Sequence, residues 1–133
     1  MRIGLMASVT DDPNTPFEAI IENAKQAEAE GFDSLWMANI FGVDAISTLA
    51  LIGRETTRIQ LGTAVTPTYP RHPTALAQQA LTTAAACDGR FNLGIGLSHK
   101  LVIEDMFGLS YEKPARHMRE YLSVLSPLVR GET

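Results

Sequence analysis

The sequence predicts an α/β fold in which helices cover a parallel β-sheet. Short apolar segments alternate with amphipathic segments of helical length, as in chains built from βα units. RIQLGTA at residues 58–64 and RFNLGIG at residues 90–96 also share one pattern at an offset of 32 residues, the length of a strand plus a helix. Four consecutive βα units follow from these observations. The expected strands lie within residues 2–7, 33–38, 58–65 and 90–97.

The predicted helices begin at residues that cap helices well. Thr15 can cap the first, with Pro16 in its first position and Glu18 completing a capping box. Asp44 is expected to start the second helix and Pro73 the third, while Pro127 is expected to kink or tighten the end of the fourth. Helical periodicity predicts the buried residues. They are Phe17, Ile20, Ile21, Ala24 and Ala27, then Ile46, Leu49, Ala50 and Gly53, then Leu76, Ala77, Ala80, Leu81 and Ala84, and finally Met118, Tyr121, Leu122 and Leu125.

Composition narrows the class of protein. A chain of 133 residues with 45% hydrophobic and 20% charged residues has the size and composition of one globular domain. A formal net charge of -4 gives no reason to expect nucleic acid or an anionic membrane as a partner. The single cysteine, Cys87, cannot form an internal disulfide, which fits a reducing cytoplasm. The apolar run near Met1 is too short for a signal-peptide core or a membrane span.

Periodicity alone leaves two architectures open, a doubly wound open sheet and part of a (β/α)8 barrel. The dinucleotide fingerprint of the first is missing, because no glycine follows the first strand and GIGLSHK lacks the third glycine. Barrel strands present a short polar cluster just beyond each carboxyl end, and all four strands here do so. These clusters occupy residues 8–10, 38–42, 64–70 and 97–100.

The ordered motifs GFDSLWMAN, LGTAVTPTYPRHPTALAQQALT, GRFNLGIGLSHK and HMREYLSVLSPLVRGE resemble the luciferase-like monooxygenase superfamily, most closely its coenzyme F420-dependent oxidoreductases. The resemblance covers essentially the whole chain. It implies a (β/α)8 barrel with a flavin or deazaflavin ring across its carboxyl-terminal mouth. By motif position it also implies a non-proline cis peptide between Ala64 and Val65, in a bulge that contacts the ring.

The candidate site residues follow from these strand ends. Ala64 permits close approach of the ring, Val65 offers an apolar contact and Thr66 can hydrogen-bond a ring heteroatom; alternatively, Ala64 and Val65 are simply the last inward-facing residues of the strand. Asn39 occupies a position where the family often contacts the deazaflavin; alternatively, it is a turn or capping residue. Ser98 can donate a hydrogen bond to the cofactor.

One strand end departs from the sugar-phosphate dehydrogenases of the family. Ile40 stands where they carry a catalytic histidine, so proton transfer must come from another group. His99 is the candidate proton donor; the alternative is a histidine of a surface loop. His72 is expected to cap the third helix, with Arg71 reaching a carboxylate, and His117 to lie away from the mouth. The three histidines show no metal-ligand spacing, so no metal site is expected.

The length predicts that residues 1–133 form a single N-terminal half-barrel, because a complete barrel needs at least about 200 residues. Its interior is expected to expose apolar surface that a second copy or a complementing half-barrel covers. The residues expected there are Leu5, either Trp36 or Leu35, Leu61 and Leu93. Three functions remain open. They are hydride transfer between F420 and a small organic substrate, FMN-dependent monooxygenation, and a non-catalytic scaffold that needs a second half.

Overall fold

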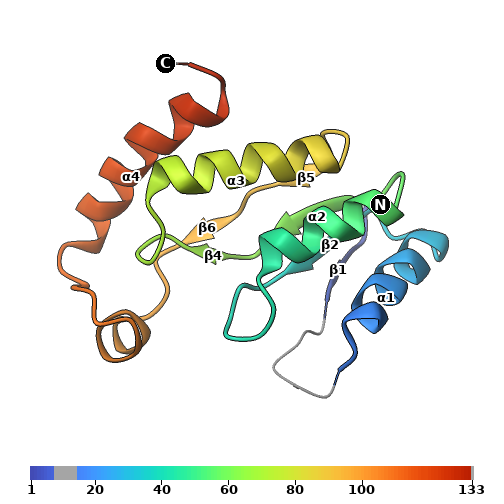
Figure 1. Cartoon of the computed structure of the whole chain (residues 1–133), viewed down its shortest axis with the longest axis horizontal. Coiled ribbons are helices and arrows are strands. Elements are labelled where there is room, and N and C mark those ends of the chain that lie inside the picture. The colour runs from blue at the N-terminus through green and yellow to red at the C-terminus, as the bar shows by residue number, and fades with distance from the viewer. Residues whose placement is uncertain (8–14, 133) are drawn as a thin grey trace.

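The computed structural model describes residues 1–7 and 15–132, and it confirms the predicted α/β fold with a parallel sheet (Figure 1). The main sheet has the order β1-β2-β3-β5, and every neighbouring pair is parallel. Its strands are β1 (Gly4–Met6), β2 (Ser34–Met37), β3 (Gln60–Thr63) and β5 (Phe91–Asn92). The helices are α1 (Phe17–Ala29), α2 (Ala45–Glu55), α3 (Pro73–Ala86) and α4 (Pro114–Val129).

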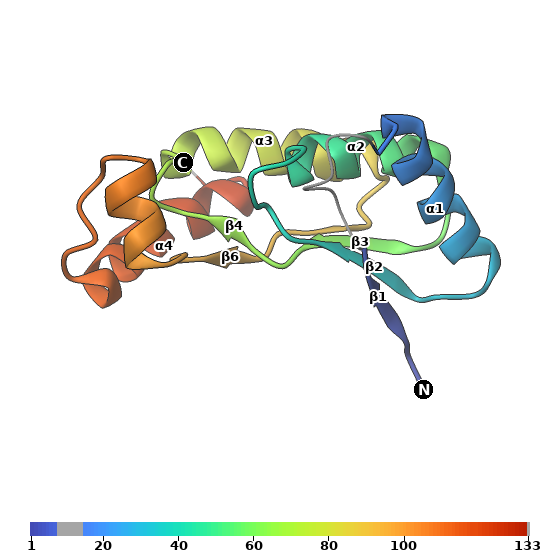
Figure 2. The same cartoon turned by 90° about the horizontal axis from the view of Figure 1, so that it is seen from below.

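Helices α1, α2 and α3 cover one face of the sheet (Figure 2). Leu5, Leu35, Leu61 and Phe91 pair across neighbouring strands, and Leu35 and Leu61 are buried with the apolar side chains of α1 and α2. Leu5, Leu35 and Leu61 therefore lie on the helical side of the sheet, so the expectation that Leu5 and Leu61 line the open face is wrong. Leu93 also packs on the helical side, against the cluster of α3 and α4.

The strand residues that alternate with Leu35 and Leu61 place their side chains on the open face of the sheet. Trp36 lies on this face, since its ring would meet a Cβ added to Gly62 at 2.4 Å and its Nε1 donates to Ser34 Oγ at 3.0 Å. Of the two candidates on that strand, Trp36 is therefore the interior residue. The difference arises because side chains alternate between the two faces of a strand, and the sequence does not say which set meets the helices.

The third strand is interrupted at its carboxyl end. After Thr63 comes the cis peptide bond between Ala64 and Val65, as expected from the resemblance. The chain then continues as β4 (Thr66–Pro67), which pairs with β6 (Ile95–Gly96) in a separate parallel ladder. Thr63 joins the two ladders, because its Oγ1 donates to the Gly94 carbonyl at 2.8 Å and accepts from the Gly94 N–H at 2.9 Å.

Helix capping was predicted correctly at two helices and wrongly at a third. His72 caps α3 as expected, because its Nδ1 accepts from the Thr74 N–H at 3.2 Å. Asp44 caps α2 by accepting from the Ser47 N–H at 2.9 Å, as expected. The N-cap of α1 is Pro16 rather than Thr15, and no side chain caps it. The ring of Pro16 fixes its φ, observed at -59°, and its extended ψ of 137° suits the N-cap position, so Thr15 lies one residue before the cap.

Two residues expected in the core are exposed. Leu81 is 46% exposed on α3 and Leu122 is 40% exposed on α4. Each lies one residue after a core position, Ala80 or Tyr121, and a helix turns by about 100° per residue. The neighbouring elements therefore cover a narrower stripe of each helix than the apolar residues in its sequence occupy.

The loop before α4 holds a short π-helix, η1 (Val102–Met106), with Ile103 buried.

Two charged residues hold the sheet at the amino-terminal ends of its strands. Glu28 accepts hydrogen bonds from the backbone N–H groups of Thr57, Arg58 and Ile59 at 3.1, 2.7 and 2.8 Å. Burial raises the pKa of Glu28, but these N–H groups outweigh it and bring the pKa below its ordinary value. Arg90, which is 8% exposed, donates to several groups at the end of α2 and the start of β3.

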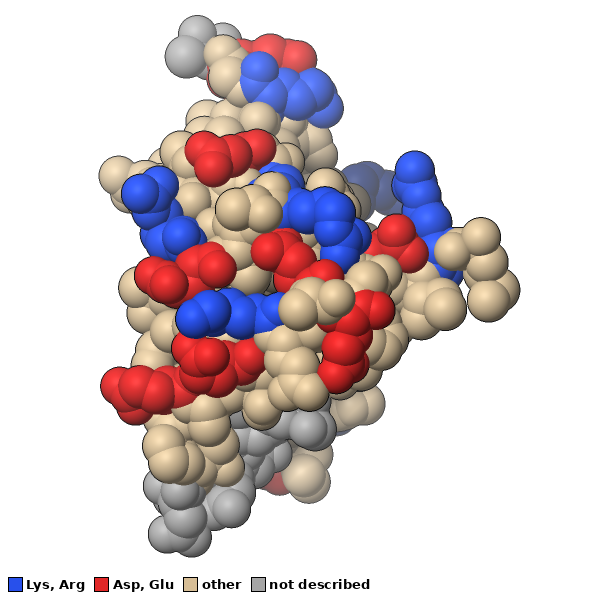
Figure 3. Space-filling model, turned by 90° about the vertical axis from the view of Figure 1, so that its right-hand side faces the viewer, with Lys and Arg blue, Asp and Glu red and all other residues tan. Residues whose placement is uncertain are grey.

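The described residues form no charged patch of a single sign on the face beside α1. Basic and acidic side chains are interspersed there (Figure 3). No helix in the described part of the chain has the length and apolar character needed to cross a membrane.

Candidate active site

A cavity of about 740 Å³ lies at the carboxyl-terminal ends of the strands, between the loops that follow β2, β3 and β6. Parallel strands end at a common edge, which is why segments far apart in sequence meet here. Its apolar wall includes Ile40, Phe41, Val65, Pro67, Val102 and Phe107. Its polar side chains are Asn39, Asp44, Arg71, Ser98 and His99.

The structure brings four of the predicted site residues to this cavity and leaves two outside its lining. Asn39, Val65, Ser98 and His99 line it, whereas Ala64 and Thr66 do not. Thr66 is fully buried, and its Oγ1 has no hydrogen-bond partner among the described residues. Side chains alternate along β4, so Val65 and Pro67 face the cavity while Thr66 points the other way. The first expected polar cluster, at residues 8–10, lies outside the described residues.

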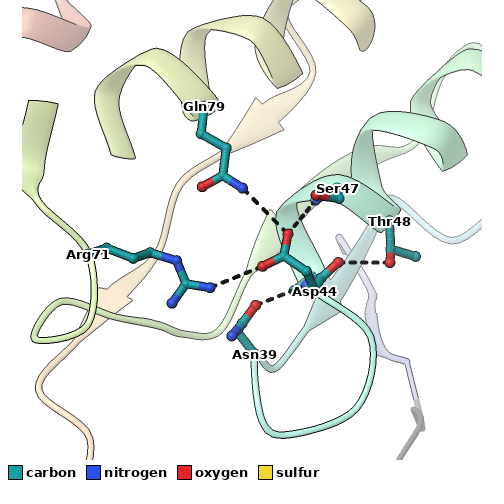
Figure 4. Close-up of polar contacts among 7 residues, drawn as sticks. Asn39, Asp44, Ser47, Thr48, Arg71 and Gln79 are labelled. Atoms are coloured by element: carbon teal, nitrogen blue, oxygen red, sulfur yellow. Dashed lines mark hydrogen bonds and ion pairs between the residues drawn. The ribbon is translucent and has the colours of Figure 1, made fainter. Parts of the chain in front are cut away.

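Asn39 combines a structural contact with a position in the cavity wall. Its Oδ1 accepts from the backbone N–H of Ala45, the first residue of α2, at 2.9 Å (Figure 4). Its backbone N–H donates to the Val65 carbonyl at 3.2 Å, which links the loop after β2 to the bulge. An N–H group requires an acceptor, so the orientation of the amide is settled. The Asn39 NH₂ group has no partner among the described residues and is the part left for a ligand.

Sequence reasoning missed the ion pair of the cavity wall. It anticipated that Arg71 would reach a carboxylate, but it did not place the pair in a binding site. Arg71 Nη2 lies 3.0 Å from Asp44 Oδ1, and Asp44 Oδ2 accepts from Ser47 N–H and, at 3.5 Å, from Gln79 Nε2 (Figure 4). Burial raises the pKa of Asp44, but the hydrogen bonds from Ser47 and the Arg71 charge outweigh it, so the pKa is lowered. Asp44 is therefore ionised at neutral pH and holds Arg71 in place.

The loop after β6 places Ser98 and His99 at the cavity. Ser98 adopts a positive φ of 61°, and its carbonyl accepts from the Tyr111 hydroxyl at 3.1 Å. The His99 carbonyl accepts from Ile103 N–H at 3.0 Å, which begins the turn leading into η1. The His99 side chain is exposed and borders the cavity, so it is accessible both to water and to a bound ligand.

A stack of aromatic rings supports the proline-rich loop of the cavity from behind. The rings of Tyr69 and His117 stack with centroids 3.8 Å apart, and Tyr69 also stacks on Tyr111 at 5.1 Å. His117 Nε2 is 2.9 Å from Thr68 Oγ1, and the Tyr121 hydroxyl donates to the Arg71 carbonyl at 2.9 Å. His117 thus lies away from the mouth, as expected, yet it helps α4 to position the loop that carries Arg71.

This stack predicts a pH-dependent loss of stability near neutral pH. Burial lowers the pKa of His117, and the nearby Glu120 only partly offsets this effect. The unfolded chain therefore takes up the proton first, so the stabilisation is complete above about pH 6.5 and declines as the pH falls toward the folded-state pKa. We expect the urea midpoint to be lower at about pH 5.5 than at about pH 7.5.

A glutamine variant isolates the contribution of His117. His117→Gln should reduce this pH dependence, whereas His99→Gln, which changes an exposed histidine, should retain it. An unchanged urea midpoint across this pH range in the parent chain would contradict the assignment.

Within residues 1–7 and 15–132, no group of three His, Cys, Asp or Glu side chains is arranged to hold a metal ion.

The chain resembles known proteins over its whole length. The family described as luciferase-like monooxygenase matches residues 1–133. The chain is 40% identical over 99 residues to a putative coenzyme F420-dependent oxidoreductase of Mycobacterium tuberculosis, covering 74% of this chain and 28% of that protein. It is 31% identical over 121 residues to 5,10-methylenetetrahydromethanopterin reductase of Methanolobus tindarius, covering 90% and 37%. The matches therefore span 28% and 37% of the length of these relatives.

Solved structures agree in fold. The oxygenating constituent of 3,6-diketocamphane monooxygenase from Pseudomonas putida, in complex with FMN, superposes with a TM-score of 0.81 at 22% identity, over 94% of this chain and 38% of that one. The coenzyme F420-dependent tetrahydromethanopterin reductase from Methanopyrus kandleri superposes with a TM-score of 0.74 at 26% identity, over 94% and 38%. Both are (β/α)8 barrels, and a match to 38% of each agrees with the predicted half-barrel.

Proposed function

The chain belongs to the luciferase-like monooxygenase family, and from this premise we propose that its cavity binds the ring of coenzyme F420. The proposed reaction is hydride transfer between F420 and a small organic substrate. The observation that carries the proposal is the convergence of Val65, Asn39, Ser98 and His99 on one cavity at the carboxyl ends of the strands. The 40% identical relative named as a putative F420-dependent oxidoreductase favours this cofactor.

The cavity fits a fused ring system in size and in chemistry. Its volume of about 740 Å³ lies within the usual range of small-molecule sites, and an apolar wall with few polar groups is typical of such sites. Val65 is 41% exposed, and its Cγ2 would lie 2.5 Å from a Cβ on Gly96. The absence of a side chain at Gly96 therefore leaves room for Val65 to form an apolar floor.

Each site residue has a distinct proposed role. Val65 contacts the face of the ring, while Ala64 and Thr66 hold its backbone, Thr66 by donating its N–H to the Gly94 carbonyl at 2.8 Å. One N–H of the Asn39 NH₂ group and the Ser98 hydroxyl donate hydrogen bonds to cofactor oxygens, which leaves the second Asn39 N–H for another ligand. A deazaflavin, when bound, donates or accepts hydride at the ring carbon that replaces the flavin nitrogen at position five. His99 then supplies the proton that the substrate needs, or takes it up in the reverse direction.

FMN is the alternative cofactor, and the FMN complex of the P. putida enzyme, which shares the fold, is the reason to consider it. With reduced FMN, the reaction would involve oxygen instead of hydride transfer to a substrate. A half-barrel that binds neither cofactor would be a scaffold. The open face of the sheet, which carries Trp36, supports the proposal that a second copy or a complementing half-barrel covers this face. We propose the cytoplasm as the location of the protein.

The proposal predicts cofactor binding by the purified chain. In separate titrations with F420 and FMN, followed by their fluorescence, we expect micromolar binding of F420. Val65→Glu should weaken it at least about tenfold, because a carboxylate would be buried against the ring. Leu122→Glu is the matched control: Leu122 is 40% exposed on α4, close to the 41% of Val65, and lies outside the cavity.

Each outcome of these titrations has a clear reading. Tighter binding of FMN than of F420 would select the monooxygenase alternative. If neither cofactor binds, the proposal that this chain takes part in catalysis is contradicted, and the non-catalytic scaffold is the function that remains. Equal losses in the two variants would mean that Val65 has no special role in the site.

A further inference from the structure

Along one edge of the cavity, formed by Asn39, Asp44 and Arg71, the unpaired polar groups are mainly hydrogen-bond donors. Both oxygens of Asp44 already accept hydrogen bonds, Oδ1 from Arg71 and Oδ2 from the Ser47 N–H. The Asn39 oxygen is likewise taken by the Ala45 N–H. The Asn39 NH₂ group and most of the Arg71 guanidinium remain without partners among the described residues (Figure 4). A ligand that satisfies this edge must therefore offer acceptors.

Arg71 is held in place as a binding group. Its backbone N–H donates to the Thr68 carbonyl at 3.1 Å, and its carbonyl accepts from the Tyr121 hydroxyl at 2.9 Å. Its side chain is 22% exposed and uses only Nη2 in a hydrogen bond, to Asp44. It is also the only lysine or arginine among the described residues that line the cavity. Such a partly buried, oriented guanidinium loses little entropy when it binds a further group.

We propose that Arg71 and Asn39 bind a carboxylate of the organic substrate, so that Arg71 is a specificity-determining residue. Asn39 and Arg71 both line the cavity (Figure 4), and two such donor groups can match the two oxygens of a planar carboxylate; charge-assisted bonds of this kind are strong. Arg71 then bridges two carboxylates, Asp44 and the substrate. Because Asp44 already neutralises Arg71, the site suits a singly charged carboxylate better than a doubly charged phosphate. This assignment rests on the proposed function, in which the cavity holds the substrate beside the cofactor.

Binding of two small probes without cofactor tests the proposal. Benzoate and benzamide have nearly the same shape, but only benzoate carries an anionic carboxylate. In ¹H–¹⁵N NMR titrations of the purified chain, we expect benzoate to shift amide signals of the cavity loops and to bind at least about tenfold more tightly than benzamide. Equal affinities, or no binding of benzoate at millimolar concentration, would overturn the assignment.

Three variants and a control variant test whether Arg71 and Asn39 are the residues that bind benzoate. Arg71→Gln should reduce benzoate binding to the level of benzamide, and Arg71→Lys should recover part of it because the charge remains. Asn39→Asp keeps an acceptor for the Ala45 N–H but replaces the free donor by a negative charge, so it should abolish benzoate binding. Arg116→Gln is the control, since Arg116 also pairs with a carboxylate, Glu120, but lies outside the cavity.

The variants also separate this inference from the proposed function. Far-ultraviolet circular dichroism checks that each variant is folded, and the comparison of Arg71→Lys with Asn39→Asp remains informative if Arg71→Gln is unstable. A preference for benzoate that survives both Arg71→Gln and Asn39→Asp would overturn the inference. Failure of F420 and FMN to bind would contradict the proposed function alone, because the probe titrations contain no cofactor.

Discussion

Replacing Arg90 by methionine is expected to lower the melting temperature of the chain by roughly 10–15 °C. Arg90 is 8% exposed and donates four hydrogen bonds of 2.8 to 3.1 Å. Their acceptors are the carbonyls of Gly53, Thr56 and Ile59 and the hydroxyl of Thr56. Methionine fills a similar volume but leaves these buried acceptors unpaired. Each buried acceptor left without a partner costs about 1–3 kcal/mol, so the loss of several is a large part of the stability of a small domain.

The experiment is a pair of thermal melts followed by circular dichroism. Arg54→Met serves as the control, because Arg54 is exposed in the last turn of the same helix, α2. A surface substitution of this kind is expected to change the stability by less than about 0.5 kcal/mol. Melting temperatures of Arg90→Met and Arg54→Met within a few degrees of each other would show that Arg90 does not clamp α2 to β3.

Gly94→Ala is expected to damage both stability and cofactor binding. A Cβ at Gly94 would lie 2.0 Å from the carbonyl oxygen of Thr63, and this backbone atom cannot move without displacing the adjoining bulge. The Gly94 carbonyl also accepts from Thr66 N–H at 2.8 Å, next to Val65. We expect a loss of about 1–3 kcal/mol in unfolding free energy, since overpacking typically costs this much. We also expect F420 affinity to fall at least about tenfold, because Val65 would shift from the cavity floor.

Gly131→Ala controls for the general effect of removing a glycine. Gly131 has a positive φ of 76°, and nothing lies within 4 Å of an added Cβ. Its substitution should therefore cost only the left-handed backbone strain, about 1–2 kcal/mol, and leave F420 binding unchanged. Denaturant titration and the fluorescence titration with F420 measure both effects. Wild-type behaviour of Gly94→Ala in both assays would rule out close packing between Gly94 and Thr63 as a determinant of the site.

Site residues could be predicted from the sequence where their position depends only on the end of a strand. Asn39, Val65, Ser98 and His99 each follow a recognisable strand, and parallel strands end at a common edge, so their meeting at one cavity follows from topology. The position of a strand end did not predict which side chains of β4 face the cavity, because side chains alternate along a strand. This alternation turns Thr66 into the interior and away from the cavity, although Thr66 is next to Val65 in the chain.

Local chemistry in the sequence determined the order of βα units, the Asp44 cap of α2 and the motifs that carry the family resemblance. Each depends on residues close together in the chain. Only the tertiary structure decided that Leu61 faces the helices, that Leu81 and Leu122 are exposed, and that Asp44 meets Arg71, 27 residues away, in the cavity wall. These features depend on which surfaces of separate elements come together, and that packing is set by the whole chain.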